Sequence, residues 1–195
     1  MQRTIFLVRH CEYANPRRVV PGRLPFPLSA VGRKRAKRLA EFFADKQITK
    51  IYSSAVLRAQ QTADQISGGK IPVVNDARLL ETFSAYQGTP SRSQKQDRLD
   101  YYTHTKELGG ETYLDIQRRI VLFFDEIRRK KEGNVIVVSH GDPVNFLFVF
   151  LHHGKLPPVS RELWDKVNAS YQSKGSIRPL ELVGGKVIIR PMVVV

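Results

Sequence analysis

Residues 4–16 read TIFLVRHCEYANP, and this stretch decides the expected fold. The run from Thr4 to Val8 is short, apolar and rich in β-branched residues, which predicts a buried strand. The strand is followed by Arg9 and His10, and a guanidinium directly behind apolar residues is costly to desolvate without an anionic partner. His10 is therefore either a satisfied structural residue or a side chain presented for chemistry.

Strand and helix patterns alternate along the rest of the chain. The Pro-rich stretch of residues 15–29, NPRRVVPGRLPFPLS, predicts a stiff extended loop, and Ser29 at its end is expected to be the N-cap of a helix. Further on we expect strands over residues 50–53, 71–74 and 134–138, helices around 59–66, from 111 and over 144–151, and a hairpin of 177–183 with 187–189. This alternation predicts an α/β fold: a three-layer sandwich with a mostly parallel central sheet flanked by helices and a C-terminal antiparallel hairpin.

The composition indicates one ordinary globular domain over residues 1–195, with 42% hydrophobic and 26% charged residues. The single cysteine, Cys11, excludes an intrachain disulfide and a thiolate zinc cluster, and it is typical of a reducing compartment. The N-terminal and later apolar runs are too short for a signal-peptide core or a membrane span. We therefore expect a cytoplasmic protein without a membrane partner.

The formal net charge of +14 has two interpretations. It could serve an anionic partner, such as a phosphorylated metabolite, nucleic acid or an acidic membrane. It could also be a solvated basic surface without a specific ligand. Net charge alone does not name a ligand, and both interpretations stay open at this point.

Polar side chains follow three of the expected strands, at the point where each strand ends. They are Arg9 and His10 after the first strand, Ser53 and Ser54 at the second with Arg58 one helical turn further on, and Ser139 and His140 at the fourth. Ligands of open α/β sheets bind beyond the carboxyl ends of the strands. If these strands are neighbours, two arginines and two histidines converge on one pocket.

Two arginines and two histidines in one pocket suit phosphoryl transfer without a metal. Guanidinium donors match phosphate oxygens, one imidazole can attack phosphorus, and a second can stabilise the charge that grows on the transferring group. The sequence has neither a Gly-rich Lys-Ser/Thr loop nor a Gly-x-Ser-x-Gly motif, which excludes a P-loop nucleotidase and a serine nucleophile elbow. We expect neither a metal nor a cofactor.

The blocks that contain these residues resemble the histidine phosphatase superfamily, which has the phosphoglycerate mutase-like fold. Arg9-His10-Cys11 resembles the family's Arg-His-Gly, SSAVLRAQQTA (53–63) its second block, and VIVVSHGDP (135–143) its final histidine block. Residues 21–36, 78–88, 109–119 and 175–177 resemble further blocks. Each block alone is weakly specific, but the ordered set spans nearly the whole chain.

The resemblance implies a role for each matching residue. His10 would attack phosphorus and become a phosphohistidine, while Glu81 would protonate the leaving oxygen and then take a proton from the attacking water. The residues implied in binding the phosphoryl oxygens are Arg9, Asn15, Arg58 and His140, with Ser54 as a further candidate. Nearby arginines should keep His10 neutral, which is the state that a nucleophile needs.

Three features depart from the family pattern. Cys11 replaces the family's glycine, so it is a tolerated small side chain, the cause of a displaced and less active His10, or an oxidisable thiol. Asn15 follows His10 one residue sooner than in the mutase branch. Ser84-Ala85 stands where a glycine is expected, and this change could move Glu81.

Three functions remain open, and the resemblance favours the first. This is a phosphatase that hydrolyses a small phosphomonoester through a phosphohistidine. The alternative is phosphoglycerate mutase-type phosphoryl transfer, although such mutases are usually longer. The second alternative is a non-catalytic basic protein that binds anions or RNA on this fold, as the net charge and Cys11 would allow.

The expected partner is a small phosphorylated substrate and not nucleic acid, and the oligomeric state stays open. Arg17, Arg18 and Arg23 of the Pro-rich loop are candidates for a second anionic group of the substrate, with plain surface exposure as the alternative. We expect the segment 89–110, which has weak periodicity, to determine substrate specificity.

Overall fold

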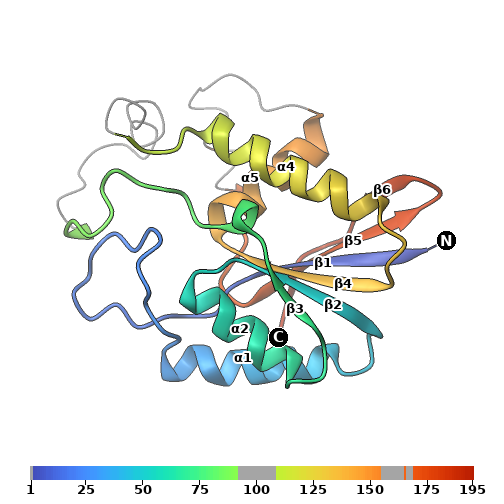
Figure 1. Ribbon diagram of the computed structural model, residues 1–195, viewed down its shortest axis with the longest axis horizontal. Helices are drawn as coiled ribbons and strands as arrows, with labels where there is room; N and C mark the ends of the chain where they lie inside the picture. Colours follow the sequence, from blue (N-terminus) through green and yellow to red (C-terminus); the bar gives the residue numbers. More distant parts are fainter. Residues whose placement is uncertain (1, 92–108, 155–164, 166–168) are drawn as a thin grey trace.

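The computed structural model describes residues 2–91, 109–154, 165 and 169–195 (Figure 1). Its elements in chain order are β1 (Arg3–Arg9), α1 (Ala30–Phe43), β2 (Ile48–Ser53), α2 (Leu57–Ser67), β3 (Val73–Asn75), the 3-10 helix η1 (Ala77–Leu79), α4 (Tyr113–Arg129), β4 (Asn134–Ser139), α5 (Gly141–His153), β5 (Ser176–Val183), β6 (Lys186–Ile189) and β7 (Val193–Val194). Every helix and strand expected from the sequence is present, with shifted bounds. Most of the expected specificity segment, 89–110, lies outside the described residues.

In the described part of the chain, seven strands form one sheet in the order β3-β2-β4-β1-β5-β6, and β7 pairs with β5. The first four strands of this order are parallel to one another, whereas β5 runs antiparallel to β1, β6 and β7. The predicted sheet and its C-terminal hairpin are confirmed. Because β5 pairs with β1, the first strand has a neighbour on each side.

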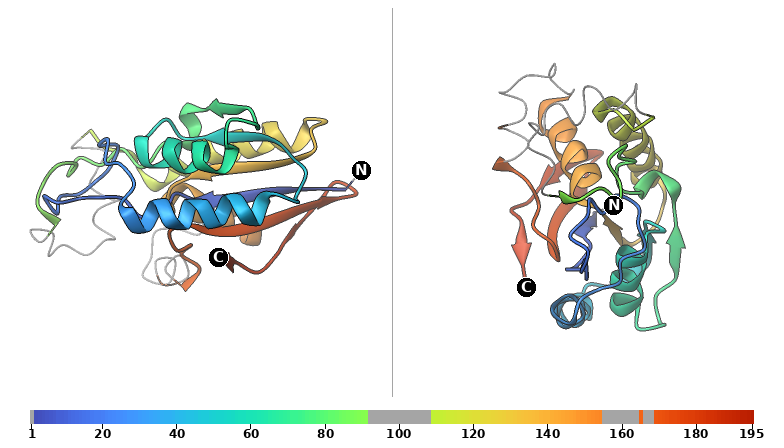
Figure 2. Two further views of the ribbon diagram at one scale, coloured as in Figure 1. Left: turned by 90° about the horizontal axis from the view of Figure 1, so that it is seen from below. Right: turned by 90° about the vertical axis from the view of Figure 1, so that its left-hand side faces the viewer.

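Helices cover both faces of the sheet, which confirms the three layers. Helices α1 and α2 lie on one face, and α4 and α5 lie on the other (Figures 1 and 2). Residues of β1 alternate between these layers: Phe6 and Val8 pack in the core with α1 and α2, while Ile5 and Leu7 pack with α4 and α5. A strand that is buried on both faces needs apolar residues at every position, which explains the unbroken run in the sequence.

Local sequence signals determine several helix ends. The Ser29 side chain caps α1 as predicted, because it accepts a hydrogen bond from the backbone N–H of Gly32 at 3.1 Å. Thr112 and Asp115 form a capping box at the start of α4. Helix α5 ends at Gly154, whose φ of 73° is a left-handed conformation that suits glycine. Among the helices of the described residues, none is long and apolar enough to cross a membrane.

Candidate active site

The carboxyl ends of β1, β2 and β4 meet because these strands are neighbours in the sheet. Arg9 pairs with Ser139 in register, so His10 and His140 are the next residues on adjacent strands. The backbone N–H of His10 donates to the Ser139 carbonyl at 2.9 Å, and the two imidazole ring centres lie 5.0 Å apart. The structure therefore brings together the strand ends that the sequence suggested.

His10 is buried, and both of its ring nitrogens have a partner. Nδ1 lies 2.7 Å from the carbonyl oxygen of Cys11, and a carbonyl only accepts, so Nδ1 carries the proton. Nε2 then has the free lone pair and accepts a hydrogen bond from Nε of Arg58 at 3.1 Å. Burial first, and the positive charge of Arg58 second, hold the pKa of His10 well below its ordinary value. The imidazole is thus neutral, as a nucleophile requires.

Arg58 lies in the first turn of α2, and its side chain is fully buried. Nη2 donates to the Gly22 carbonyl at 2.8 Å and to Oε2 of Glu81 at 3.3 Å, while Nη1 donates to the Leu24 carbonyl at 3.3 Å. One guanidinium therefore connects the nucleophile candidate His10, a carboxyl group and the Pro-rich loop. A planar group held by several hydrogen bonds is oriented before any ligand binds.

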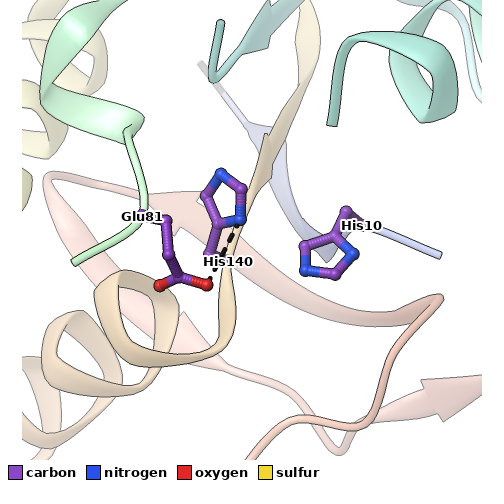
Figure 3. Close-up of side chains that lie close together, drawn as sticks. All are labelled: His10, Glu81 and His140. Carbon is purple, nitrogen blue, oxygen red and sulfur yellow. Dashed lines mark ion pairs between the residues drawn. The ribbon is translucent and has the colours of Figure 1, made fainter. Parts of the chain in front are cut away.

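Glu81 and His140 lie against one another next to His10, as Figure 3 shows. Nδ1 of His140 is 3.4 Å from Oε2 of Glu81, and Nε2 is 2.8 Å from the hydroxyl of Ser54. Ser54 therefore belongs to the site through His140. Burial, with Arg58 as the next cause, holds the pKa of His140 well below its ordinary value, so this second imidazole is also neutral.

Glu81 lies in the loop that follows η1, where Oε1 accepts a hydrogen bond from the backbone N–H of Thr82 at 3.0 Å. Burial and the neighbouring carboxylate of Asp142 raise the pKa of Glu81, although Arg58 opposes them. A raised pKa favours the protonated carboxyl that a general acid needs. Ser84-Ala85, in place of the family's glycine, leaves Glu81 within the site.

Arg9 is held from the opposite end of the chain. Its Nη1 donates to the Gln172 carbonyl at 2.8 Å, and its Cζ lies 5.0 Å from the centre of the Tyr171 ring. Among the described residues, Nε of Arg9 is buried without a hydrogen-bond partner, and so is Nδ1 of His140, whose 3.4 Å contact with Glu81 is not a hydrogen bond. Buried polar atoms without a partner are rare in proteins, and two in one site favour a ligand with polar oxygens.

The segment 171–174 completes the site, and sequence reasoning missed it. The Gln172 side chain donates to backbone carbonyls of β1 and β5 at 2.9 and 2.8 Å, which positions the carbonyl that holds Arg9. Nζ of Lys174 lies 4.6 Å from the centre of the Tyr13 ring. No periodicity or spacing marks a loop residue such as Gln172, whose partner Arg9 lies 163 positions away.

Asp142, in the first turn of α5, is fixed by two hydroxyl groups. Its carboxylate accepts hydrogen bonds from Tyr171 at 2.7 Å and from Thr82 at 3.0 Å. A Cβ atom at Gly141 would lie 2.1 Å from the Tyr171 hydroxyl oxygen. Glycine is therefore required at position 141 for the approach of Tyr171 to Asp142.

A family model with the description "Histidine phosphatase superfamily (branch 1)" matches residues 5–172. The chain belongs to the histidine phosphatase superfamily. The matched range runs from β1 beyond α5 and contains His10, Arg58, Glu81 and His140, so the resemblance seen in the ordered sequence blocks is confirmed.

Individual members of the superfamily resemble the chain over most of its length. It is 30% identical over 161 residues to phosphoserine phosphatase 1 of Hydrogenobacter thermophilus, with 75% of each chain covered. It is 32% identical over 148 residues to a Yersinia enterocolitica protein named "Probable phosphoglycerate mutase GpmB", with 70% of this chain and 69% of the relative covered. The solved structure of YhfR from Bacillus stearothermophilus matches with a TM-score of 0.81 at 27% identity, covering 96% of this chain and 95% of YhfR. The names of the first two relatives support phosphatase or mutase activity for the superfamily.

Cys11 stands in place of the superfamily's glycine and is accommodated in the core. The side chain is buried in the cluster beneath α1 and α2, and its backbone N–H donates to the Thr62 hydroxyl at 3.1 Å. The Cys11 carbonyl accepts a hydrogen bond from Nδ1 of His10, so the ring of the nucleophile candidate keeps its orientation. Burial raises the pKa of the Cys11 thiol to about 12. The geometry favours a tolerated small side chain over an oxidisable thiol.

We expect Cys11 to be unreactive toward a thiol reagent while the protein is folded. A buried thiol with a raised pKa provides almost no thiolate at neutral pH, and thiolate is the reactive form. With a chromogenic disulfide reagent, the native protein should react at less than about a tenth of the rate seen in guanidinium chloride. Rapid stoichiometric reaction of the native protein would restore the oxidisable-thiol interpretation.

Asn15 and Arg23 are engaged by other parts of the protein. The Asn15 amide donates to the carbonyl of Val19 at 2.7 Å and accepts from its N–H at 3.2 Å, so a contact with phosphate stays a prediction. Arg23 donates to the Glu81 carbonyl at 2.8 Å and pairs with Glu111 at 3.0 Å. Arg23 therefore positions the Glu81 loop and is not free for a second anion of the substrate. The two other arginines of the Pro-rich loop are exposed.

His10, Glu81 and His140 could geometrically hold a metal ion, because one ligand atom of each lies within 4.8 Å of the others. The surrounding charges favour an anion instead. Arg58 contacts both His10 and Glu81, and two further cations act on His10. A divalent cation would have to displace the buried guanidinium from both contacts, which is unfavourable.

Proposed function

We propose that the protein is a phosphatase that hydrolyses a small phosphomonoester through a phosphohistidine at His10. One observation carries this proposal: His10 is buried, with Nδ1 bound to the Cys11 carbonyl and Nε2 accepting a hydrogen bond from Arg58. An imidazole held in this tautomer offers a lone pair to phosphorus without first losing a proton.

In the first step, Nε2 of His10 forms a bond to phosphorus as the bond between phosphorus and the ester oxygen breaks. Arg58 transfers its donated hydrogen bond from Nε2 to a phosphoryl oxygen. Protonated Glu81 gives its proton to the departing oxygen, so a neutral alcohol leaves. The Nδ1 proton stays on the ring, where the Cys11 carbonyl stabilises the positive charge of the phosphorylated imidazole.

In the second step, a water molecule attacks phosphorus while Glu81, now ionised, takes one of its protons. The bond between Nε2 and phosphorus breaks, which restores neutral His10 and releases inorganic phosphate. Glu81 thus acts first as acid and then as base, and it ends each cycle in its starting state.

Several donor groups would stabilise the phosphoryl group in transit. Arg9 and Arg58 provide guanidinium donors, and neutral His140 contributes Nδ1, which has no hydrogen-bond partner among the described residues. Helix α5 begins directly after His140, so its first backbone N–H groups and its positive dipole end lie at the same strand end. Donors fixed in advance stabilise growing charge without reorganisation during the reaction.

A single-turnover experiment with a radiolabelled phosphomonoester tests the intermediate. Base quenching and peptide mapping should locate an acid-labile, base-stable phosphoramidate on His10. His10→Ala should take up no label, whereas His152→Ala, which changes an exposed histidine, should label normally. Phosphate release without labelled protein at any time would indicate direct attack by water. Salt-dependent RNA binding without phosphate release from any ester would support the non-catalytic alternative.

Mutase-type transfer is the second candidate function, because the Yersinia relative is named a phosphoglycerate mutase. Both reactions share the first step and differ in whether water or a second hydroxyl accepts the phosphoryl group. Incubation with phosphoglycerates plus bisphosphoglycerate separates them. Isomer interconversion that is faster than phosphate release would replace the phosphatase proposal.

Glu81→Gln should lower kcat/KM by about 10²–10³ for an alkyl phosphate and by less than about tenfold for an aryl phosphate. An alkoxide is a poor leaving group that needs a proton, whereas a nitrophenolate leaves unprotonated. Steady-state kinetics with the two esters measures the difference. Equal losses on both esters would exclude Glu81 as the general acid.

The pH dependence gives a second measurement on the same variant. Because burial and Asp142 raise the pKa of Glu81, the wild-type protein should keep its proton donor until the pH rises past this raised value. For the alkyl ester, kcat/KM should therefore fall on the alkaline side. Glu81→Gln should lack this decline because an amide does not titrate, and a decline that survives would belong to another group.

A further inference from the structure

Lys174 lies beside the proposed phosphoryl-binding residues, in a loop held against the end of β1. The backbone N–H of the next residue, Gly175, donates to the carbonyls of Arg9 at 3.0 Å and His10 at 3.2 Å. Gly175 has a φ of 67°, and a Cβ atom there would lie 2.4 Å from Cδ of Arg35. The turn that positions Lys174 therefore depends on a glycine that other residues would strain.

The Lys174 ammonium and the Arg58 guanidinium contact the same aromatic ring. Nζ of Lys174 lies 4.6 Å and Cζ of Arg58 lies 5.0 Å from the centre of the Tyr13 ring. That ring centre is in turn 5.5 Å from the His10 ring centre. A cation–π contact orients an ammonium while its N–H donors stay available for an anion.

Lys174 acts on His10 more weakly than the two arginines do. Among the positive groups that lower the pKa of His10, Arg58 has the strongest effect, Arg9 follows and Lys174 has the weakest. Arg58 contacts Nε2 of His10 directly at 3.1 Å, whereas the Lys174 ammonium lies over the Tyr13 ring.

The charge of Lys174 has no ion-pair partner among the described residues. The carboxylate that acts on it, Glu12, is paired with Arg35 at 3.2 Å. Burial and the nearby Arg9 lower the pKa of Lys174, so its environment opposes the charge. A half-buried ammonium next to guanidinium groups gains stability when an anion binds.

In the proposed mechanism, the donors for the transferred phosphoryl group come from Arg9, Arg58 and His140. Lys174 adds a further cation beside this set, over the Tyr13 ring that Arg58 also contacts. A second anionic group of the substrate, next to the phosphoryl group, would pair with this ammonium.

We propose that Lys174 binds a second anionic group of the substrate, either a carboxylate or a second phosphate, next to the transferred phosphoryl group. This inference rests on the proposed function and narrows its substrate class to phosphomonoesters with a second negative group. The sequence suggested that Arg23 binds this second anionic group, but Arg23 contacts the Glu81 carbonyl and Glu111 instead. We assign this role to Lys174.

Ligand binding to His10→Ala tests the inference, because that variant should not consume the ligands. Phosphoglycolate differs from ethyl phosphate by a carboxylate in place of a methyl group, and ethylene glycol bisphosphate supplies a second phosphate. Both of these ligands carry a second anionic group. In calorimetry at low salt, at least one of them should bind about tenfold or more tightly than ethyl phosphate. The tighter of the two identifies the source of the second charge.

Lys174→Met, added to His10→Ala, should abolish the tighter binding of the ligand with a second anionic group. The Kd for ethyl phosphate should stay within about threefold of its value in His10→Ala alone. Lys174→Arg should keep the preference because it keeps the cation. Lys46→Met is the matched control, since Nζ of Lys46 also lies over an aromatic ring, that of Phe42, at 5.3 Å. It should change none of the three dissociation constants.

Three results would overturn the inference. The first is that His10→Ala binds neither ligand with a second anionic group more tightly than ethyl phosphate. The second is that this preference persists after Lys174→Met is added. The third is that Lys174→Met weakens the binding of ethyl phosphate equally, which would assign Lys174 to the transferred phosphoryl group. These results are independent of the labelling of His10. Labelled His10 without a ligand preference refutes only the role of Lys174, whereas a preference without labelling refutes only the phosphohistidine.

Discussion

His10→Ala should reduce kcat/KM for an aryl phosphate by about four orders of magnitude or more. The substitution removes the atom that attacks phosphorus in the proposed mechanism, and the remaining groups can only assist direct attack by water. An aryl ester needs no proton on its leaving group, so the loss reports on the nucleophile and not on Glu81. Nitrophenol release, followed optically, measures it.

Loss of folding is the main competing explanation, because His10 is 1% exposed. Circular dichroism should show that the variant stays folded at the assay temperature. Added imidazole should restore measurable turnover to the folded variant, because it refills the position of the deleted ring. His152→Ala, at the exposed end of α5, should retain wild-type activity. A His10→Ala protein with near wild-type turnover would contradict the mechanism.

The layers of the fold and the meeting of its strand ends could be predicted because both follow from local patterns. Residues 5–8 and 135–138 are unbroken apolar runs, and both prove to be strands buried on their two faces. Parallel strands present their carboxyl ends at one edge, so the histidine that follows each run had to lie near the other once the strands were neighbours.

The order of the strands could not be predicted from the same patterns. The position of β4 between β2 and β1, and of β5 beside β1, depends on contacts between distant segments. The loop of Gln172 and Lys174 was missed for the same reason, because its residues acquire a role only through Arg9 and His10 at the other end of the chain.

The partners of individual side chains also lay beyond sequence reasoning. Sequence reasoning named Arg23 as a candidate anion ligand and did not single out Lys174. In the structure, Arg23 is paired with Glu111, while Lys174 has no ion pair among the described residues. The neutral state of His10 was predicted from its arginine neighbours. Its larger cause is burial, which a residue at the end of a strand does not reveal.

Arg58→Lys should lower kcat/KM for the aryl ester by about 10²–10³. Lysine keeps the charge but has a single ammonium, which cannot contact His10, Glu81 and the Pro-rich loop together as the guanidinium does. The phosphoryl group would then lose a bidentate donor, and the carboxyl group and loop carbonyl would lose a fixed partner. The expected result is a large loss that charge conservation does not prevent.

The matched control is Arg33→Lys on α1, where an exposed arginine also donates to a backbone carbonyl, that of Leu28, at 2.7 Å. It should change kcat/KM by less than about twofold. Thermal unfolding of both variants separates lost stability from lost chemistry, because Arg58 also holds the Gly22 carbonyl. If Arg58→Lys is folded at the assay temperature and its kcat/KM stays within about threefold of wild type, Arg58 does not stabilise the transferring phosphoryl group.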